Sequence, residues 1–245
     1  MVTHADQLRL LDLQALDTRI AQLKHAKANH PTLARIVELD SQLADLNVTL
    51  IDSRTAVSDL GREVRKAEDD VTTVLDRLRR NQERIDYGGL SAKDTQALMQ
   101  DAETLERRRD LLETAQLESM ERLEAHQAAL TEVEAAYQVL EDTKSAVEAE
   151  RDAAFAEINS EGREVITERK ALEGTIDAGL VATYEQIRAR KGGVGAAALR
   201  AGRCEGCGLE LTAVDLDALR STPLDAVGRC EECGRILVRL GDLSA

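Results

Sequence analysis

Large aromatic side chains and proline are nearly absent from this sequence of 245 residues. It contains no tryptophan, three tyrosines, one phenylalanine and two prolines. A wide globular core needs aromatic bulk to fill it, so this composition argues against such a core. Charged residues make up 32% of the chain. The mixture is typical of long helices that pack through a narrow apolar seam.

Long apolar runs are also missing. No stretch approaches the roughly 20 consecutive apolar residues that a membrane helix needs. The segment Met1–Asp6 lacks a basic stretch followed by an apolar one, so no signal peptide is predicted. We therefore expect a soluble, cytoplasmic protein without a membrane partner. In that reducing compartment, four cysteines in two pairs favour a metal site over disulfides.

Basic charge is scarce along most of the chain. The whole sequence has a net charge of −14, and residues 188–245 hold nine Lys/Arg against eight Asp/Glu. Residues 1–187 therefore hold 23 basic and 38 acidic groups, a net charge of −15. A long acidic segment repels phosphate backbones. Any nucleic acid is thus expected to bind only near the C-terminal region.

Apolar residues in the first region repeat at alternating steps of four and three. Twelve of 14 seam positions between Leu39 and Ile85 are apolar, and a shorter stretch of the same kind runs from Leu13 to Leu23. A 3.5-residue repeat held for almost seven heptads predicts a left-handed coiled coil. Residues 29–31, Asn-His-Pro, separate the two stretches and predict a kink or break, because proline begins helices but does not continue them.

The heptad pattern stops at residues 86–91, Asp-Tyr-Gly-Gly-Leu-Ser. Paired glycines allow the positive φ angles of a tight reversal, and Ser91 with Asp94 resembles a helix-capping box. A second, weaker heptad series follows, with polar seam positions at Arg109, Gln116, Ser119, His126, Lys144 and Arg151. Glycines at 162, 174 and 179 predict a softer stretch, because glycine weakens helix interiors.

These patterns predict a mainly α protein with two domains. Residues 1–190 form a long antiparallel helical coiled-coil hairpin with its tip near 86–91, and residues 191–245 form a small β zinc ribbon. The hairpin returns the chain to its N-terminal end, so we expect the ribbon beside the N-terminus. The glycine-rich residues 192–195 predict a flexible joint. A shorter three- or four-helix bundle is the alternative, which the long heptad run disfavours.

The strongest motif is a pair of Cys-x-x-Cys-Gly sequences. Cys204-Glu-Gly-Cys207-Gly and Cys230-Glu-Glu-Cys233-Gly are separated by 22 residues. Zinc prefers four tetrahedral ligands, and two such turns supply four thiolates. The alternating segment Arg235–Leu240 predicts a strand leaving the second turn, whereas residues 212–220 fit a short helix or an extended insertion. The motif predicts one structural zinc ion, coupled to folding of a unit too small to be held by burial alone.

Two other kinds of site also use cysteine pairs, namely redox dithiols and iron sites. A redox dithiol uses one Cys-x-x-Cys near a helix start, a context that this sequence lacks. Iron remains chemically possible, because four thiolates also bind iron. Catalytic zinc keeps one position for water, whereas four cysteines would fill every position. A structural rather than catalytic ion is therefore expected.

The chain resembles a bacterial family of coiled-coil proteins with a C-terminal C4-type zinc ribbon. The resemblance rests on the junction Leu180-Val-Ala-Thr-Tyr184, on Gly192-Gly193-Val194 and on Cys230-Glu-Glu-Cys233-Gly-Arg-Ile-Leu237. It implies Cys204, Cys207, Cys230 and Cys233 as metal ligands. It also implies nucleic-acid binding or an adaptor role toward transcription or secretion components, and no enzymatic activity. Residues 188–245 contain no aromatic side chain, so they lack the base stacking that contributes much of the affinity of single-strand-binding proteins.

Two functions remain open at this point. The first is a non-enzymatic adaptor or scaffold whose protein partners the sequence does not name, with no small-molecule substrate. The alternative is binding of RNA or DNA at the ribbon by nearby basic residues, which are Arg188, Arg190, Lys191, Arg200 and Arg203. These cations could equally neutralise the zinc–thiolate charge and nearby glutamates, or bind the last carbonyls of a helix.

Overall fold

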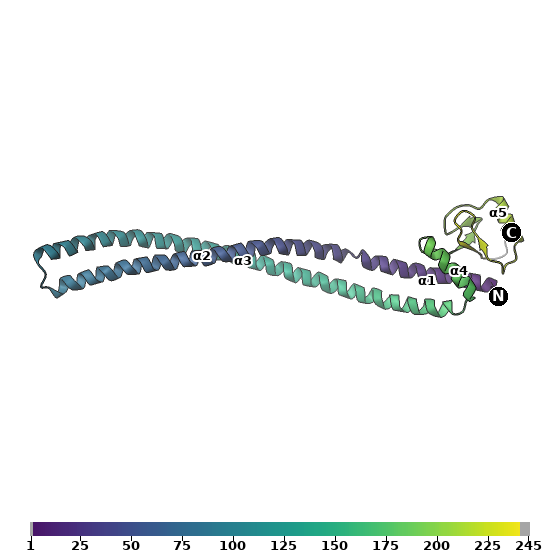
Figure 1. Cartoon of the computed structure of the whole chain (residues 1–245), viewed down its shortest axis with the longest axis horizontal. Coiled ribbons are helices and arrows are strands. Elements are labelled where there is room, and N and C mark those ends of the chain that lie inside the picture. The colour runs from purple at the N-terminus through teal and green to yellow at the C-terminus, as the bar shows by residue number, and fades with distance from the viewer. Residues whose placement is uncertain (1, 241–245) are drawn as a thin grey trace. The chain divides into compact units, whose positions relative to one another are not determined.

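The computed structural model describes residues 2–240 of the chain. Figure 1 shows the order of its elements, and the two compact units are Met1–Leu33 with Ala149–Ala245, and Ala34–Glu148. The helices are α1 (His4–Ala28), α2 (Pro31–Tyr87), α3 (Ala92–Glu173), α4 (Ala178–Arg190) and α5 (Ala213–Ser221), and the strands are β1 (Ala196–Arg200), β2 (Arg203–Cys204), β3 (Gly228–Arg229) and β4 (Ile236–Arg239). None of the described helices is long and apolar enough to cross a membrane.

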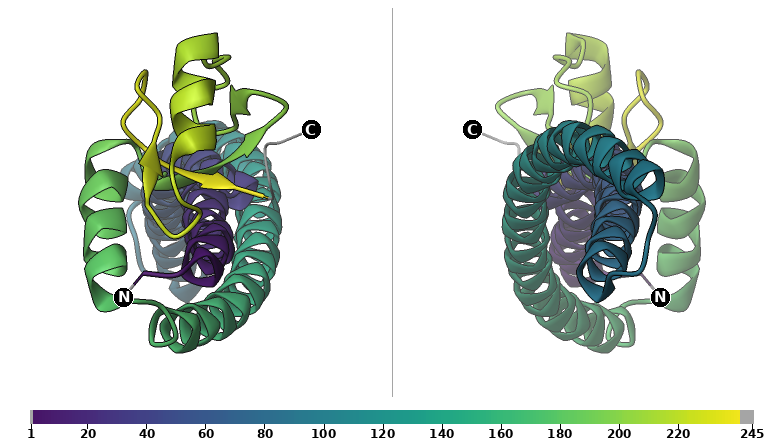
Figure 2. Two further views of the ribbon diagram at one scale, coloured as in Figure 1. Left: turned by 90° about the vertical axis from the view of Figure 1, so that its right-hand side faces the viewer. Right: turned by 90° about the vertical axis from the view of Figure 1, so that its left-hand side faces the viewer.

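The unit of residues 34–148 is an antiparallel pair of helices joined by residues 88–91. Figure 2 shows this link on its right-hand side, where α2 passes into α3. The seam of α2 is buried at positions spaced by heptads, namely Leu39, Leu50, Leu60, Val64, Val71 and Val74. On the facing helix, only Leu105 is buried to the same degree. The seam is therefore asymmetric, as the polar positions in the second heptad series indicate.

The reversal has the local structure that its sequence predicts. Gly88 and Gly89 have φ angles of 76° and 79°. The Ser91 hydroxyl oxygen accepts a hydrogen bond from the Asp94 backbone N–H at 3.2 Å. Nearby, Asn81 is buried in the seam and donates to Asp101 at 2.8 Å, and Arg77 makes two hydrogen bonds to the same carboxylate. A polar contact in the seam of this kind favours one register of the two helices.

The other unit combines α1, the last part of α3, α4 and the ribbon. Thr3 caps α1 through a capping box with Asp6. The glycines at 162, 174 and 179 predict a less stable stretch of helix, and the structure has a break there. Helix α3 ends at Glu173, and Asp177 caps a separate helix, α4. The Asp177 carboxylate accepts from the backbone N–H groups of Gly179 and Leu180. This pattern is typical of a strong helix start.

The ribbon is a four-stranded sheet with strand order β2-β1-β4-β3. Strands β1 and β4 are parallel, and the two short outer strands are antiparallel to them. The sequence of residues 212–220 fits either a helix or an extended insertion, and the structure has a helix there, α5, with Thr212 as its N-cap. Arg239 is buried and donates to the backbone oxygens of Leu219, Thr222 and Pro223, so it secures the end of this helix.

Both faces of the sheet are covered. Ala196, Ile236 and Val238 pack with Leu10 of α1 and Tyr184 of α4 in one apolar cluster. Alternate residues on the same strands join a second cluster, formed by Ala197, Leu199, Cys204, Leu211, Leu219, Cys230 and Leu237. Side chains alternate between the two faces of a strand, so one sheet serves both clusters. Figure 2 shows α4 and the strands gathered around α1 on its left-hand side.

The start of α1 lies against the ribbon, as the sequence predicts. The His4 backbone N–H donates to Asp225 at 2.9 Å, and the buried Gln7 amide donates to the Leu224 oxygen at 2.9 Å. The expected flexible joint at residues 192–195 is wrong. Gly195 is buried, its N–H donates to Gln14 at 2.7 Å, and a Cβ there would lie 2.7 Å from the Tyr184 ring. The glycine is needed for close packing rather than for flexibility.

Candidate metal centre

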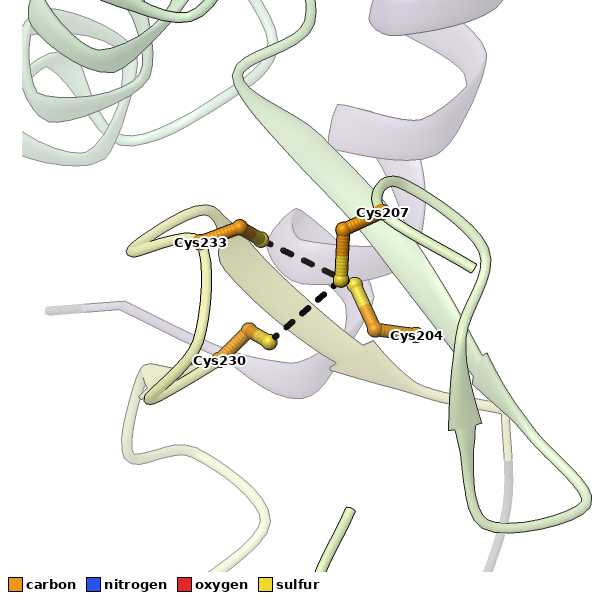
Figure 3. A group of neighbouring side chains, drawn as sticks. All are labelled: Cys204, Cys207, Cys230 and Cys233. Atoms are coloured by element: carbon orange, nitrogen blue, oxygen red, sulfur yellow. Dashed lines mark hydrogen bonds between the residues drawn. The ribbon is translucent and has the colours of Figure 1, made fainter. Parts of the chain in front are cut away.

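The four cysteines converge from two turns at the edge of the sheet. Cys204 ends β2, and Cys207 lies in the turn that follows it; Cys230 follows β3, and Cys233 precedes β4. Cys204 and Cys230 are buried, whereas Cys207 and Cys233 are half-buried. Figure 3 shows their sulfur atoms pointing toward one common position. Each turn thus contributes one inner and one outer thiol.

The two turns have matching backbone geometry. The Gly208 N–H donates to the Cys204 oxygen at 2.8 Å, and the Gly234 N–H donates to the Cys230 oxygen at 2.7 Å. Both glycines have positive φ angles, 75° and 72°. A residue with a Cβ would be strained in this conformation, which explains the glycine after each second cysteine.

The sulfur positions fit a tetrahedral metal ion. The Cys204 and Cys233 sulfurs are 4.0 Å apart, the Cys207 and Cys230 sulfurs are 3.9 Å apart, and all four lie within 4.8 Å of one another. A zinc–sulfur bond of about 2.3 Å in a regular tetrahedron requires a sulfur–sulfur distance of about 3.8 Å. A disulfide needs about 2.05 Å, so these are free thiols. The four cysteines can therefore hold zinc with little movement.

Protonation of the metal-free thiols is uneven. Burial raises the pKa of the Cys230 thiol to about 12 and also raises the pKa of Cys204. Burial acts in the same direction on Cys233, but hydrogen bonds from Arg235 and from neighbouring thiols outweigh it and lower the pKa of Cys233 to about 7. A metal binds thiolates, so the inner thiols must lose their protons when it enters.

Arg235 connects the metal centre to the end of α4. It follows the second turn directly, and its guanidinium donates to the Val194 oxygen at 3.0 Å and to the Lys191 oxygen at 2.8 Å. The same side chain passes over the first turn, because a Cβ on Gly206 would lie 2.8 Å from the Arg235 Cδ. One residue thus touches the first turn, the second turn and the helix end.

A buried polar network lies beneath the ribbon, where α1, α3 and α4 meet. The Asp17 carboxylate accepts from the Tyr184 hydroxyl at 2.7 Å and from the Arg169 guanidinium at 2.8 Å. Arg188 lies 3.3 Å from the same carboxylate, and Arg169 also pairs with Glu185. The Asp17 side chain is only 3% exposed. A buried carboxylate needs such partners to offset its lost hydration.

Gln14 extends this network to the link between α4 and β1. Its side-chain oxygen accepts from the Gly195 N–H, and its amide donates to the Gly193 oxygen at 3.1 Å and to Thr18 at 3.0 Å. The network therefore fixes the chain just before it enters the ribbon.

The five predicted basic contact residues lie in two segments of the chain, the end of α4 and the β1–β2 pair. Arg188 and Arg190 are in the last turn of α4, followed by Lys191, whereas Arg200 and Arg203 are register partners on β1 and β2. They do not share one environment. Arg188 is held by Asp17 and Glu185, and Arg200 pairs with Glu205 at 2.6 Å. Arg190, Lys191 and Arg203 are exposed.

Sequence reasoning missed the residues that join the ribbon to the helices. These are Gln14, Asp17, Arg169, Tyr184, Arg235 and Arg239. Two signals could have pointed to some of them. Tyr184 is the only aromatic residue of the sequence after Phe155. Asp17 stands among apolar heptad positions, where an unpaired carboxylate would be costly.

Comparison with known proteins agrees with this geometry. Residues 13–192 match the CT398-like coiled coil hairpin domain, and residues 203–237, which contain all four cysteines, match the C4-type zinc ribbon domain. The uncharacterized protein Rv2229c of Mycobacterium tuberculosis is 33% identical over 236 residues, covering 96% of each chain.

Two solved structures share the fold. One from Mycobacterium smegmatis has a TM-score of 0.85 at 33% identity and covers 98% of this chain and 100% of its own. The structure of CT398 from Chlamydia trachomatis has a TM-score of 0.65 at 21% identity, covering 96% and 98%. The chain belongs to the CT398-like coiled-coil hairpin family, and its C-terminal ribbon is a C4-type zinc ribbon domain.

Proposed function

We propose that this protein is a non-enzymatic adaptor in which one zinc ion folds the ribbon and protein partners bind the helical hairpin and the ribbon. The observation that carries the proposal is the set of four cysteine sulfurs within 4.8 Å of one another. Four thiolates complete the tetrahedral shell of zinc, so no position is left for water or substrate. The ion then serves to hold structure.

The surroundings of the cysteines support a structural role. The ribbon is fastened to the helices by Arg235, Gln7 and Gln14, and its sheet is covered on both faces. Such a site would hold the ribbon in one conformation for partner binding, rather than take part in a reaction. The cytoplasm is the proposed location, since reduced thiols there remain free to bind metal.

The charge of the ribbon surface supports a protein partner rather than a nucleic acid. Arg235 and Arg239 are used on backbone oxygens inside the fold, and Arg200 is paired with Glu205. A zinc ion with four thiolates adds a charge of about −2. The exposed Glu231 and Glu232 lie between the second pair of cysteines. This local negative charge would repel phosphates.

Affinity capture from native lysate tests the proposal, with Cys204→Ser compared with wild type. Glu232→Gln is the matched control, because it changes an exposed residue between two ligands without removing a thiol. We expect stoichiometric protein partners on wild type and on the control. Partners of the ribbon are lost with Cys204→Ser, and partners of the hairpin are retained. Absence of any stoichiometric protein partner on wild type would contradict an adaptor function.

A salt titration with single- and double-stranded nucleic acid tests the alternative function. Binding through the ribbon would be micromolar or tighter, fall steeply with salt, and be lost with Arg200→Glu/Arg203→Glu. We expect no such binding even at low salt.

A further inference from the structure

An apolar groove runs between α1 and the last part of α3. It has a volume of about 430 Å³. Ile20 and Leu23 of α1 and Ile158 and Ile166 of α3 supply its apolar lining. Leu23 is buried, whereas Ile166 is 51% exposed. An isoleucine that is half exposed beside a groove leaves apolar surface that a further element could cover.

The charged residues that line this groove are all basic. They are Lys24, Lys27 and Arg163. Lys27 is held in place by a hydrogen bond to Asn159 at 2.8 Å and lies 5.2 Å from the centre of the Phe155 ring. Within residues 2–240, neither Lys24 nor Arg163 has a carboxylate partner, although Arg19, on the same helix as Lys24, pairs with Glu161.

The charge of this groove is opposite to that of the helical region as a whole. Residues 1–187 carry a net charge of −15, whereas α1 holds four Lys/Arg against three Asp/Glu. A basic rim around an apolar floor is complementary to a ligand that is apolar on one side and acidic at its flanks.

Gly162 lines the same groove and has no explanation within the chain. It lies inside α3, where glycine is less favourable than alanine. A Cβ built at this position meets no atom within 4 Å, and its φ is not positive. Neither close packing nor backbone conformation therefore requires glycine here. A missing side chain in a groove wall allows another backbone to approach closely.

We propose that this groove binds an amphipathic helix of a partner protein, with an apolar stripe toward Ile20, Ile158 and Ile166 and acidic residues toward Lys24 and Arg163. Two neighbouring helices offer a groove into which a third helix packs by its i, i+3, i+4 and i+7 positions. This inference rests on the proposed adaptor function and names one binding surface for it.

Selection from a displayed library of helical peptides tests the inference on the full-length, zinc-loaded chain. The library keeps one leucine stripe constant and varies the flanking positions among Glu, Lys, Gln and Ala. We expect enrichment of Glu at the flanks. Binding of the best peptide should weaken at least about tenfold with Lys24→Glu/Arg163→Glu and weaken as salt rises. Lys66→Glu/Arg80→Glu on α2 is the charge-matched control, which should bind like wild type.

Gly162→Leu provides a second variant that changes no charge. It should fill the groove and weaken the same peptide at least about tenfold, while circular dichroism and zinc content stay unchanged. Gly162→Ala should raise the thermal midpoint of the protein and weaken the peptide, a combination that a purely structural role for the glycine does not produce.

Several outcomes would overturn the inference. The first two are selected peptides without acidic flanking residues, and a Lys24→Glu/Arg163→Glu variant that binds the best peptide as tightly as wild type does. The third is a dimer of this chain that the same substitutions dissociate. The fourth is displacement of the peptide by anionic lipid vesicles but not by neutral ones. If every partner that Cys204→Ser retains is also retained by the groove variants, the groove assignment fails and the adaptor function stands. If wild type captures no partner, the adaptor function itself fails.

Discussion

The Tyr184 hydroxyl donates a hydrogen bond of 2.7 Å to the Asp17 carboxylate, joining α4 to α1 beneath the zinc ribbon. Tyr184 and Asp17 are both buried. The same tyrosine ring packs against Gly195, the residue just before the first strand of the ribbon. The position of the ribbon on the helices thus depends on polar contacts as well as on apolar packing.

Tyr184→Phe removes the hydroxyl and keeps the ring. We expect the free energy of unfolding to fall by about 1–2 kcal/mol, because Asp17 loses one buried hydrogen bond but keeps Arg169 and Arg188. Denaturant unfolding followed by circular dichroism measures the change. Tyr87→Phe is the control, since Tyr87 is 94% exposed and should give no change. Equal stability of Tyr184→Phe and wild type would contradict the role of this bond.

Alkaline pH should weaken the same contact. Burial, followed by the hydrogen bond to Asp17, raises the pKa of Tyr184 above its ordinary value of 10.0. Above that value the unfolded chain loses a proton that the folded chain retains, so stability falls as pH rises. The contribution of this group is complete below pH 10 and declines by about 1.4 kcal/mol per pH unit above it.

Comparison with Tyr184→Phe isolates this effect from other titrating groups. The difference in unfolding free energy between wild type and the variant should be constant from pH 7 to pH 9 and should shrink above pH 10. A difference that stays constant up to pH 11 would show that Tyr184 ionises normally in the folded protein.

Zinc affinity should rise steeply with pH. The thiols of Cys204 and Cys230 have raised pKa values and remain protonated near neutrality, so each must release a proton when the metal binds. Loss of two protons predicts an increase in apparent affinity of at least about a hundredfold per pH unit. Competition with a chromophoric chelator at pH 6.5 and 7.5, corrected for protonation of the chelator, measures it. An affinity that is independent of pH would mean that the thiols are already ionised.

Arg235→Met should separate metal binding from attachment of the ribbon. The variant keeps all four cysteines and the backbone N–H of residue 235, and it loses the side-chain hydrogen bonds to Val194 and Lys191 and the side-chain contact that helps to lower the pKa of Cys233. We expect full zinc content with a loss of about 1.5–3 kcal/mol in stability, because hydrogen bonds from a charged group are stronger than average. Arg229→Met is the control, because Arg229 is the exposed residue of β3. Loss of zinc by Arg235→Met alone would assign this arginine to metal binding instead.

Patterns within short stretches of sequence predicted most of the fold. The heptads from Leu39 to Ile85 indicated the coiled coil, and the paired glycines indicated the reversal, because each depends on neighbours within one or two turns. The four cysteines could be assigned from spacing alone, since two residues between thiols suit one tetrahedral ion.

The attachment of the ribbon could not be predicted in the same way. Asp17 and Tyr184 are 167 residues apart, and their contact depends on the register of three helices. Polar residues interrupt both heptad series, and sequence alone does not say which of them become buried partners. Gly195 illustrates the difficulty, because a glycine in a sequence is compatible with flexibility and with close packing alike. In the structure, Gly195 is present because the Tyr184 ring packs against its backbone.

Hydrogen exchange of the zinc-loaded and zinc-stripped protein tests the central claim most directly, namely that zinc holds the ribbon folded on the helices. We expect the amides of residues 196–239 to lose their protection when the metal is removed, while those of residues 34–148 exchange as before. A ribbon whose amides stay protected without metal would contradict the account, because its fold would then not depend on the four cysteines.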